Sequence, residues 1–192
     1  MNAPFGNIQF LAQIEKIAAS GVKAVVLREK DLSLNDYLDL ARDVLEICAK
    51  RNVQLIVHSQ YRAALELRCP LHLPCNVFKE NSPILKDVLS FGVSVHNTEE
   101  AELAIARKAD WLIGGHIYNT KSKDGIEGRG PEFLAELCKL SPVPVYGIGG
   151  INEHNITAIA GTGAAGACLM SSLMQSPNPS ALISALTNNI NH

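Results

Sequence analysis

Short apolar runs alternate with longer amphipathic stretches along this chain from Ala24 onward. Each amphipathic stretch repeats its apolar positions with the period of a helix, as at Leu34, Leu38, Ala41 and Leu45. Such alternation is typical of parallel strands joined by crossover helices. The pattern therefore predicts an α/β protein.

The pattern predicts seven strands and eight helices. The strands are residues 24–28, 54–58, 71–73, 92–95, 111–115, 145–147 and 166–170. The helices are residues 7–20, 33–51, 61–66, 81–89, 98–108, 130–139, 152–161 and 179–188. The alternatives are a (β/α)₈ TIM barrel and an open doubly wound sheet. The barrel is favoured because the eight helices match eight repeats, and its first strand is then absent or formed irregularly by residues 4–10.

Composition supports one compact domain, and we predict a single (β/α) barrel domain over residues 1–192. The chain is 47% apolar and 19% charged, so it can bury a large core. A net charge of −2 argues against a nucleic-acid partner. The five cysteines lie mostly in apolar runs, which suits reduced thiols. Neither a secretory signal nor an apolar run long enough to cross a membrane is visible. We therefore predict a cytoplasmic protein. An incomplete barrel would expose a sheet edge, which predicts a homo-oligomer, most simply a dimer.

Polar residues follow the predicted strands, where the loops of a parallel barrel converge on one mouth. These candidate site residues are Arg28, Lys30, His58, His96, His116, Thr120, Ser122, Lys123, Gly149, Gly150, Ser171 and Ser172.

A phosphate site is predicted where Gly149 and Gly150 lead into Asn152. Glycine N–H groups before a helix can cradle a phosphate, and the loops after the last two strands are its usual place in barrels. Glycine also serves bends and close packing, which is the structural alternative. Nearby serine hydroxyls and basic side chains favour the phosphate reading, so the expected partner is a small phosphorylated substrate.

His116 ends a buried strand after Gly114 and Gly115, and it precedes a glycine-framed basic loop. Histidine alone has an ordinary pKa near neutrality, so His116 is the predicted acid/base. His58 and His96 fit equally well as strand-end histidines that hydrogen bond with their neighbours.

Cys69, His72 and Cys75 lie close together but have no fourth zinc ligand at a recognisable spacing. Strand alternation sends the two cysteines to one face and His72 to the other. No metal site is predicted here.

Several segments together resemble the thiamine-phosphate synthases and their TenI-type relatives, the thiazole tautomerases. The segments are VLREK at 26–30, SVHN at 94–97, residues 114–130 with TKSK at 120–123, GIGGI at 147–151 and AGACLMS at 165–171. The resemblance spans most of the chain and implies a (β/α)₈ barrel.

Departures within the family favour the tautomerase branch. The synthases carry glutamine where this chain has Val26, an Asn-Asp pair at His58-Ser59, and a further magnesium-binding aspartate where residues 73–76 offer none. Magnesium needs hard carboxylate oxygens to hold a pyrophosphate. The tautomerases resemble this chain in having histidine at position 116. The resemblance thus implies an enzyme that uses neither metal nor cofactor.

The implied reaction is the isomerisation of a carboxythiazole phosphate to its aromatic tautomer, with His116 moving the proton. Phosphate would lie on Gly149, Gly150 and Ser171, with Lys123 and Arg28 as anion contacts. Lys30 is typical of the synthases, where it faces pyrophosphate. The alternatives are a noncatalytic thiazole-phosphate binding or regulatory protein and, third, a thiamine-phosphate synthase.

Overall fold

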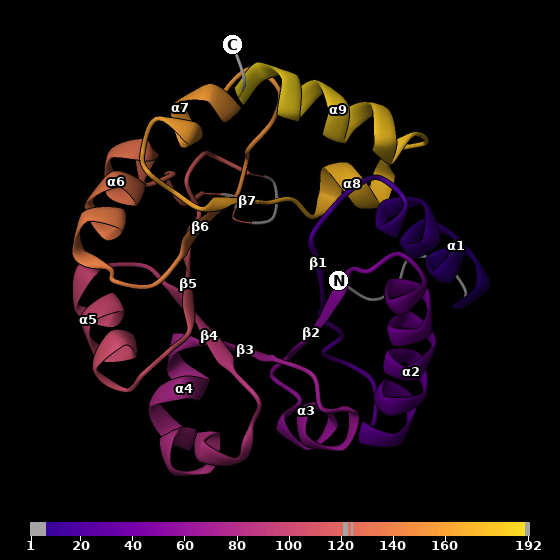
Figure 1. The fold of residues 1–192 in the computed structure, drawn as a ribbon. Helices are drawn as coiled ribbons and strands as arrows, with labels where there is room; N and C mark the ends of the chain where they lie inside the picture. Colours follow the sequence, from indigo (N-terminus) through magenta and orange to yellow (C-terminus); the bar gives the residue numbers. More distant parts are fainter. Residues whose placement is uncertain (1–6, 121–122, 124, 191–192) are drawn as a thin grey trace.

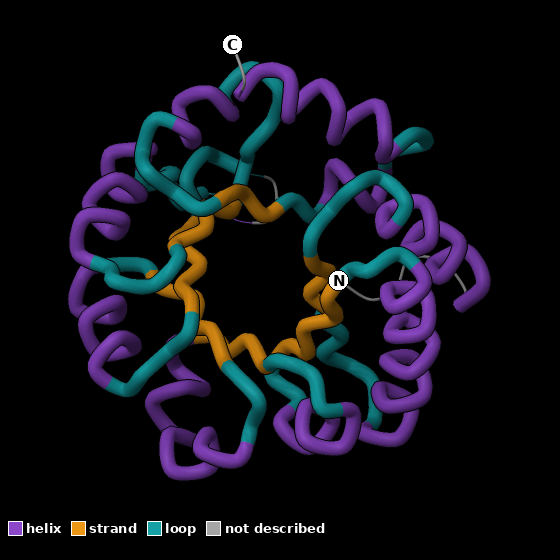
Figure 2. Tube along the Cα trace, viewed as in Figure 1, coloured by secondary structure: helices purple, strands orange, loops and turns teal. Residues whose placement is uncertain are grey.

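Seven parallel strands form one sheet that curls into a ring, with the helices outside it (Figure 1; Figure 2). The computed structural model describes residues 7–120, 123 and 125–190. The strands are β1 (Ala24–Leu27), β2 (Gln54–His58), β3 (Leu71–Pro74), β4 (Phe91–Val95), β5 (Trp111–Gly115), β6 (Val145–Ile148) and β7 (Gly166–Cys168). Each strand pairs in parallel with the next one along the chain.

The helices follow the strands in alternation. They are α1 (Asn7–Ala18), α2 (Leu34–Lys50), α3 (Tyr61–Leu67), α4 (Cys75–Asn81), the 3₁₀ helix η1 (Ser82–Asp87), α5 (Thr98–Ala106), α6 (Gly130–Leu140), α7 (Ile156–Ala160), α8 (Ser171–Gln175) and α9 (Pro179–Ile190). Ser33 caps α2 by accepting the N–H of Asp36, as expected of a serine before a helical apolar stripe.

The predicted barrel architecture is confirmed: seven parallel strands form one curled sheet with the helices outside it. In the described part of the chain, β1 and β7 are the two ends of the strand order and do not pair with each other. Residues 7–10, predicted as a possible strand, begin α1, and residues 4–6 lie outside the described residues. Gln13 of α1 donates to the carbonyl oxygens of Leu173 and Ser176, at 2.7 and 2.9 Å, which joins α1 to the α8 region.

One predicted helix is wrong. Residues 81–89 were expected to form it, but α4 begins at Cys75, directly after β3, and η1 follows. Pro83 has no amide hydrogen to continue α4, so the helix ends before it.

Two further boundaries differ near the predicted phosphate site. β7 ends at Cys168, so Ser171 and Ser172 begin α8 and do not directly end a strand. α7 begins at Ile156 and not at Asn152, because the intervening residues form a turn held by asparagine side chains.

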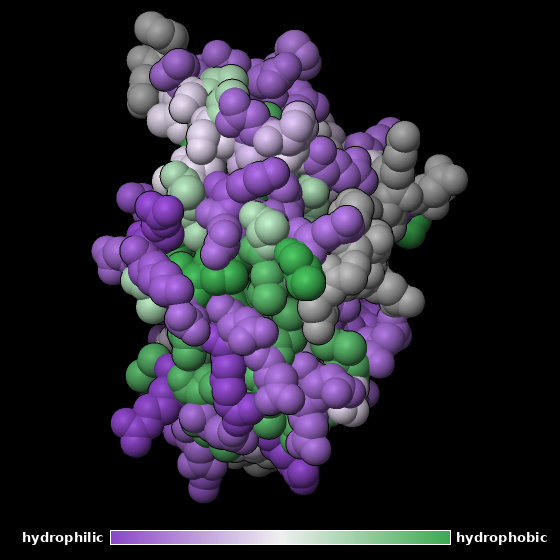
Figure 3. All heavy atoms as spheres, turned by 90° about the vertical axis from the view of Figure 1, so that its right-hand side faces the viewer, coloured by the Kyte–Doolittle hydropathy of each residue, from purple (hydrophilic) through white to green (hydrophobic). Residues whose placement is uncertain are grey.

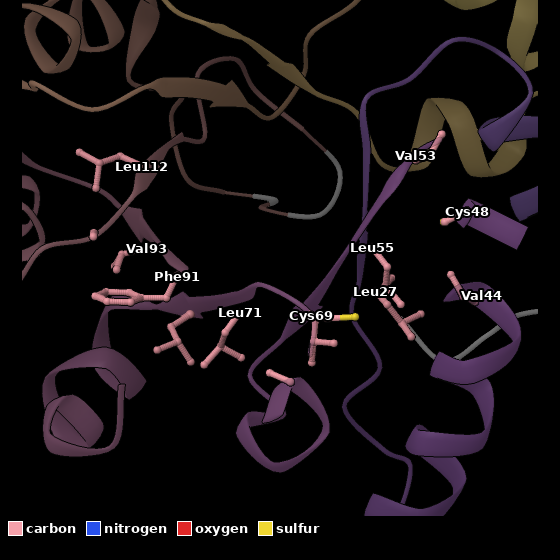
Figure 4. Packing of buried hydrophobic residues seen from close by; sticks show 14 of the residues in the cluster. Leu27, Val44, Cys48, Val53, Leu55, Cys69, Leu71, Phe91, Val93 and Leu112 are labelled. Atoms are coloured by element: carbon pink, nitrogen blue, oxygen red, sulfur yellow. The ribbon is translucent and has the colours of Figure 1, made fainter. Parts of the chain in front are cut away.

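Alternate residues of each strand have different surroundings. One set packs against the helices and is almost fully buried (Figure 4); it includes Leu27, Leu55, Leu71, Val93 and Leu112. The residues between them point to the inside of the ring and include His58, His72, Ser94, Trp111 and Tyr146. The helix-facing set is continuous apolar core, whereas the ring interior carries most of the polar chemistry.

Most of the surface seen in Figure 3 is hydrophilic. On the face that carries α1 and α2, polar residues surround a hydrophobic area (Figure 3). Among the described helices, none combines the length and apolar character that crossing a membrane requires.

Candidate active site at the carboxyl ends of the strands

The carboxyl ends of the strands share one side of the ring because every strand pair is parallel. In barrels of this kind the loops at that side form the active site. Predicted site residues follow four of these ends: Arg28 and Lys30 after β1, His58 at the end of β2, His116 after β5, and Gly149 and Gly150 after β6.

The glycine turn after β6 packs against the segment after β5. Gly149 and Gly150 have φ angles of +101° and +67°, which favour glycine. A Cβ atom at Gly149 would overlap the Cβ of His116, so only glycine permits this approach. The N–H of Tyr118 donates to the carbonyl oxygen of Gly149 at 3.0 Å. The structure thus brings His116 and the predicted phosphate turn together.

Two asparagines hold the same turn from the other side. The side-chain amide of Asn155 donates to the carbonyl oxygen of Gly150 at 3.0 Å, and its Oδ1 accepts the N–H of Asn152 at 2.8 Å. Asn152 in turn accepts the N–H of His154 at 2.9 Å. The shape of the turn is therefore set by the protein's own hydrogen bonds.

His116 is buried, with 6% of its surface exposed. Its Nε2 lies 3.1 Å from the carbonyl oxygen of Ile126. A carbonyl oxygen only accepts, so Nε2 carries the proton in this hydrogen bond. This hydrogen bond links His116 to the loop between β5 and α6.

That loop carries the predicted Thr120, Ser122 and Lys123. Thr120 is half-buried and Lys123 is exposed, while Ser122 lies outside the described residues. Asn119 fixes the loop's base by accepting the N–H of Gly128 at 2.6 Å. The predicted Ser171 and Ser172 lie on the first turn of α8, half-buried and exposed respectively.

Arg28, Lys30 and His58 form the basic side of the site. Nδ1 of His58 lies 2.9 Å from Oγ of Ser59. Burial, and then the charges of Arg28 and Lys30, lower the pKa of His58 to about 4. The imidazole is therefore neutral at pH 7. The structure brings these three predicted residues to neighbouring strand ends, because β1 pairs with β2.

His72, which the sequence analysis considered only as a possible zinc ligand and gave no role in the site, lies inside the ring. It is 2% exposed inside the ring, its Nε2 lies 2.8 Å from Oγ of Ser94, and its ring stacks on Trp111 at 6.2 Å between centroids. The centroid of His58 lies 5.8 Å away. Among the described residues Nδ1 of His72 has no hydrogen-bond partner. Burial, and then His58, lower its pKa to about 3. The alternation of side chains along β3 could have identified His72, because it places this residue on the opposite face from the neighbouring cysteines.

His96 forms hydrogen bonds with its neighbours, as one of its two sequence readings proposed. Its N–H and Nδ1 lie 2.9 and 3.0 Å from Oε2 of Glu100. Nε of Arg129 donates to the carbonyl oxygen of His96 at 2.8 Å, and the guanidinium lies 5.8 Å from the ring of Phe133. Arg129 thereby joins the loops after β4 and β5.

The donor set does not fit magnesium. At the ends of β2 and β3 stand His58-Ser59 and Pro74-Cys75, and none of these is a carboxylate. Within the described ranges, no three His, Cys, Asp or Glu side chains are grouped so that they could hold a metal ion. Cys69 joins Cys75 in the helix-facing core. Magnesium prefers hard oxygen ligands, including one or two carboxylates.

Fold and site together define a (β/α) barrel whose mouth combines a glycine turn with exposed basic side chains. Residues 2–173 match the family described as thiamine monophosphate synthase, and the chain belongs to this family. The thiamine-phosphate synthase of Fusobacterium nucleatum is 31% identical over 188 residues, which cover 95% of this chain and 90% of that protein. The thiamine-phosphate synthase of Methanobrevibacter smithii is 33% identical over 177 residues, 89% of this chain and 83% of that protein.

A solved structure, the thiamine phosphate pyrophosphorylase of Pyrococcus furiosus, shares the fold. Its TM-score is 0.80 at 22% identity, over 94% of this chain and 89% of that one.

These comparisons correct the functional prediction from the sequence. The prediction of a thiazole tautomerase is wrong, because the similar named proteins are thiamine-phosphate synthases and nothing in them is specific to the tautomerase branch. The third alternative, the synthase, agrees better with these relatives. That prediction rested on the residues that replace the magnesium-binding carboxylates and on the histidine at position 116. The contact of His116 with Ile126 gives this histidine a structural use as well.

Proposed function

We propose that this chain is a transferase that forms thiamine phosphate, in thiamine biosynthesis. A phosphorylated pyrimidine would lose its diphosphate as pyrophosphate while it forms a bond to a phosphorylated thiazole. The observation that carries this proposal is the family match over residues 2–173, supported by relatives named thiamine-phosphate synthases that align over most of the chain.

Two parts of the mouth would hold the two substrates. The thiazole phosphate would contact the N–H groups of Gly149 and Gly150, with the hydroxyls of Ser171 and Ser172. Thr120 and Lys123 would approach it from the loop that is hydrogen-bonded to His116 through the carbonyl oxygen of Ile126. The diphosphate would lie at Arg28, Lys30 and His58.

The direct test is incubation of the purified chain with the pyrimidine diphosphate and the thiazole phosphate. Chromatography should show thiamine phosphate, and an enzymatic assay should show an equal amount of pyrophosphate. If neither product forms with or without magnesium, the transferase proposal is wrong.

A pair of glycine variants tests the phosphate turn. Gly149→Ala would force a side chain against His116 and distort the turn. We expect kcat/KM to fall at least about tenfold, as for a lost hydrogen bond to a charged group. Gly21→Ala is the matched control, since Gly21 has a φ of +92° but nothing within 4 Å of its position for a Cβ. Equal losses in both variants would show that backbone strain alone is responsible.

A second candidate function is a noncatalytic binding protein for the same phosphorylated ligands. The absence of a carboxylate at the ends of β2 and β3 favours it, because that side would lack the cation chemistry of the synthases. Tight calorimetric binding of the thiazole phosphate, without any product in the synthesis assay, would support this candidate over the first.

A further inference from the structure

The strand ends where the synthases carry magnesium-binding carboxylates offer other chemistry in this chain. His58 ends β2 with an imidazole, and Ser59 follows it with a hydroxyl. Pro74 ends β3, and Cys75, which follows it, is only 3% exposed. Imidazole, hydroxyl and thiol groups are poor substitutes for the oxygen ligands that magnesium demands.

Two carboxylates near these strand ends are hydrogen-bonded or buried. Glu100 accepts hydrogen bonds from the N–H of His96 at 2.9 Å and from its Nδ1 at 3.0 Å, and Lys79 lies 3.7 Å away. Glu29 is 8% exposed, and burial raises its pKa. Glu100 is thus engaged by His96, and burial disfavours the charged form of Glu29 that would bind a cation.

Positive charge stands at the same side of the mouth. Arg28 and Lys30 are exposed and follow β1, the strand that pairs with β2. Leu27 pairs with Val57, so Arg28 and His58 occupy neighbouring positions at the ends of β1 and β2. An arginine can bind a phosphate through two parallel hydrogen bonds, and a lysine adds a compact charge. His58 adds a neutral ring that can hydrogen bond.

We propose that this side of the mouth binds a diphosphate group without a divalent cation, with Arg28 and Lys30 neutralising its charge and His58 adding a hydrogen bond. The identity of the natural diphosphate rests on the proposed function. The independence from metal rests on the side chains present at the ends of β1, β2 and β3.

Calorimetry with inorganic pyrophosphate tests this directly on the full chain. We expect binding in EDTA to be at least as tight as binding in millimolar magnesium chloride, since magnesium also binds the free anion. Rising salt should weaken the binding, because it screens exposed charges. Binding that appears only with magnesium would overturn the proposal, and so would no binding under either condition.

Variants of the two cations test their assignment. Arg28→Met and Lys30→Met should each weaken metal-free binding at least about tenfold, the usual effect of losing a hydrogen bond between charged groups. Lys23→Met and Arg51→Met are matched controls, because these exposed residues precede β1 and β2 at the opposite ends of the strands. The controls should bind pyrophosphate as the parent chain does. Metal-free binding that survives the loss of both cations would overturn the assignment.

A carboxylate placed after β2 should make pyrophosphate binding depend on magnesium. Ser59 has a φ of +63°, a conformation that aspartate and asparagine adopt more readily than most residues. Ser59→Asp should weaken pyrophosphate binding about tenfold in EDTA, through repulsion, and magnesium should restore part of it. Ser59→Asn adds no charge, so it should change neither the binding of pyrophosphate in EDTA nor the effect of magnesium on it. Unaltered metal-free binding in Ser59→Asp would contradict the proposal.

The synthesis assay separates this inference from the proposed function. If pyrophosphate binds without metal but no thiamine phosphate forms, the proposed function is wrong and the metal-free site is supported. If synthesis and pyrophosphate binding both require magnesium, the metal-free site is wrong and the proposed function is supported.

Discussion

The two faces of the sheet differ although the same seven strands build both. The helix-facing side is apolar and closed, as Leu71 and Leu112 show with 0% exposure. The ring interior holds His58, His72 and Trp111, and both His58 and Trp111 are partly open to solvent.

The difference shows how one strand can serve stability and chemistry at once. Alternation directs every second side chain to the helices, where burial contributes about 25 cal/mol for each Å² of apolar surface. The other side chains line the interior of the ring, so they can be polar without interrupting the core. Substitutions on the two faces should therefore have different consequences, and the following experiments test this from the largest expected effect to the smallest.

Truncating a side chain that faces the helices should cause the largest loss in the free energy of unfolding. Leu112→Ala removes a fully buried side chain and should lower the free energy of unfolding by about 2–5 kcal/mol, measured by urea denaturation. Ile148→Ala, on the half-buried interior side of β6, is the matched comparison and should cost less. Equal losses at both positions would show that the two faces do not differ in packing.

Acid should lower the free energy of unfolding through the histidines inside the ring. The pKa values of His58 and His72 are lowered to about 4 and about 3 in the folded chain, so the unfolded chain binds more protons below its histidine pKa of about 6.5. Their contribution to stability is complete above about pH 6.5 and is lost as the pH falls toward the folded values. Between pH 7 and pH 5 we expect a loss on the order of 2 kcal/mol per histidine, and less for the partly exposed His58.

Denaturation at several pH values measures this loss. His72→Asn should flatten the pH dependence of the unfolding free energy. His154→Asn is the control, because the His154 side chain is 86% exposed. A flattening of equal size in both variants would refute the interior assignment.

The contact between Gly92 and Trp111 can be probed by overpacking. A Cβ atom at Gly92 would overlap the indole ring, so Gly92→Ala should displace it and cost about 1–3 kcal/mol. Trp111 is the single tryptophan of the chain, so intrinsic fluorescence reports its displacement directly. Gly166→Ala is milder, since its Cβ would lie 3.3 Å from Tyr146. An unchanged emission spectrum in Gly92→Ala would mean that the ring does not pack there.

The smallest effect should come from the outer surface. Arg42 pairs with Asp39 and Glu66, but about half of its side-chain surface is exposed at 49%. Arg42→Ala should change the free energy of unfolding by less than about 1 kcal/mol, measured by urea denaturation at low and high salt. A larger loss would place this pair among the structural contacts and weaken the contrast with the core.

Much of the fold could be read from local patterns. All seven strands lie at or near their predicted positions, because each is a short apolar run between breaks in the pattern. Ser33 marked the start of α2 through its cap, which acts within one turn. The helix at residues 81–89 failed because α4 starts directly after β3, and no change in hydrophobic period marks that boundary.

The sequence by itself determined the strands, most helices, the residues at the strand ends and the membership of one family, because these depend on local order along the chain. Only the tertiary structure decided that His72 stacks on Trp111 and that Nε2 of His116 donates to the carbonyl oxygen of Ile126. It also decided that burial, and then the charges of Arg28 and Lys30, lower the pKa of His58. These relations join residues from different strands and loops. Their distances and burial arise from the curling of the sheet and from packing, which no spacing along the sequence specifies.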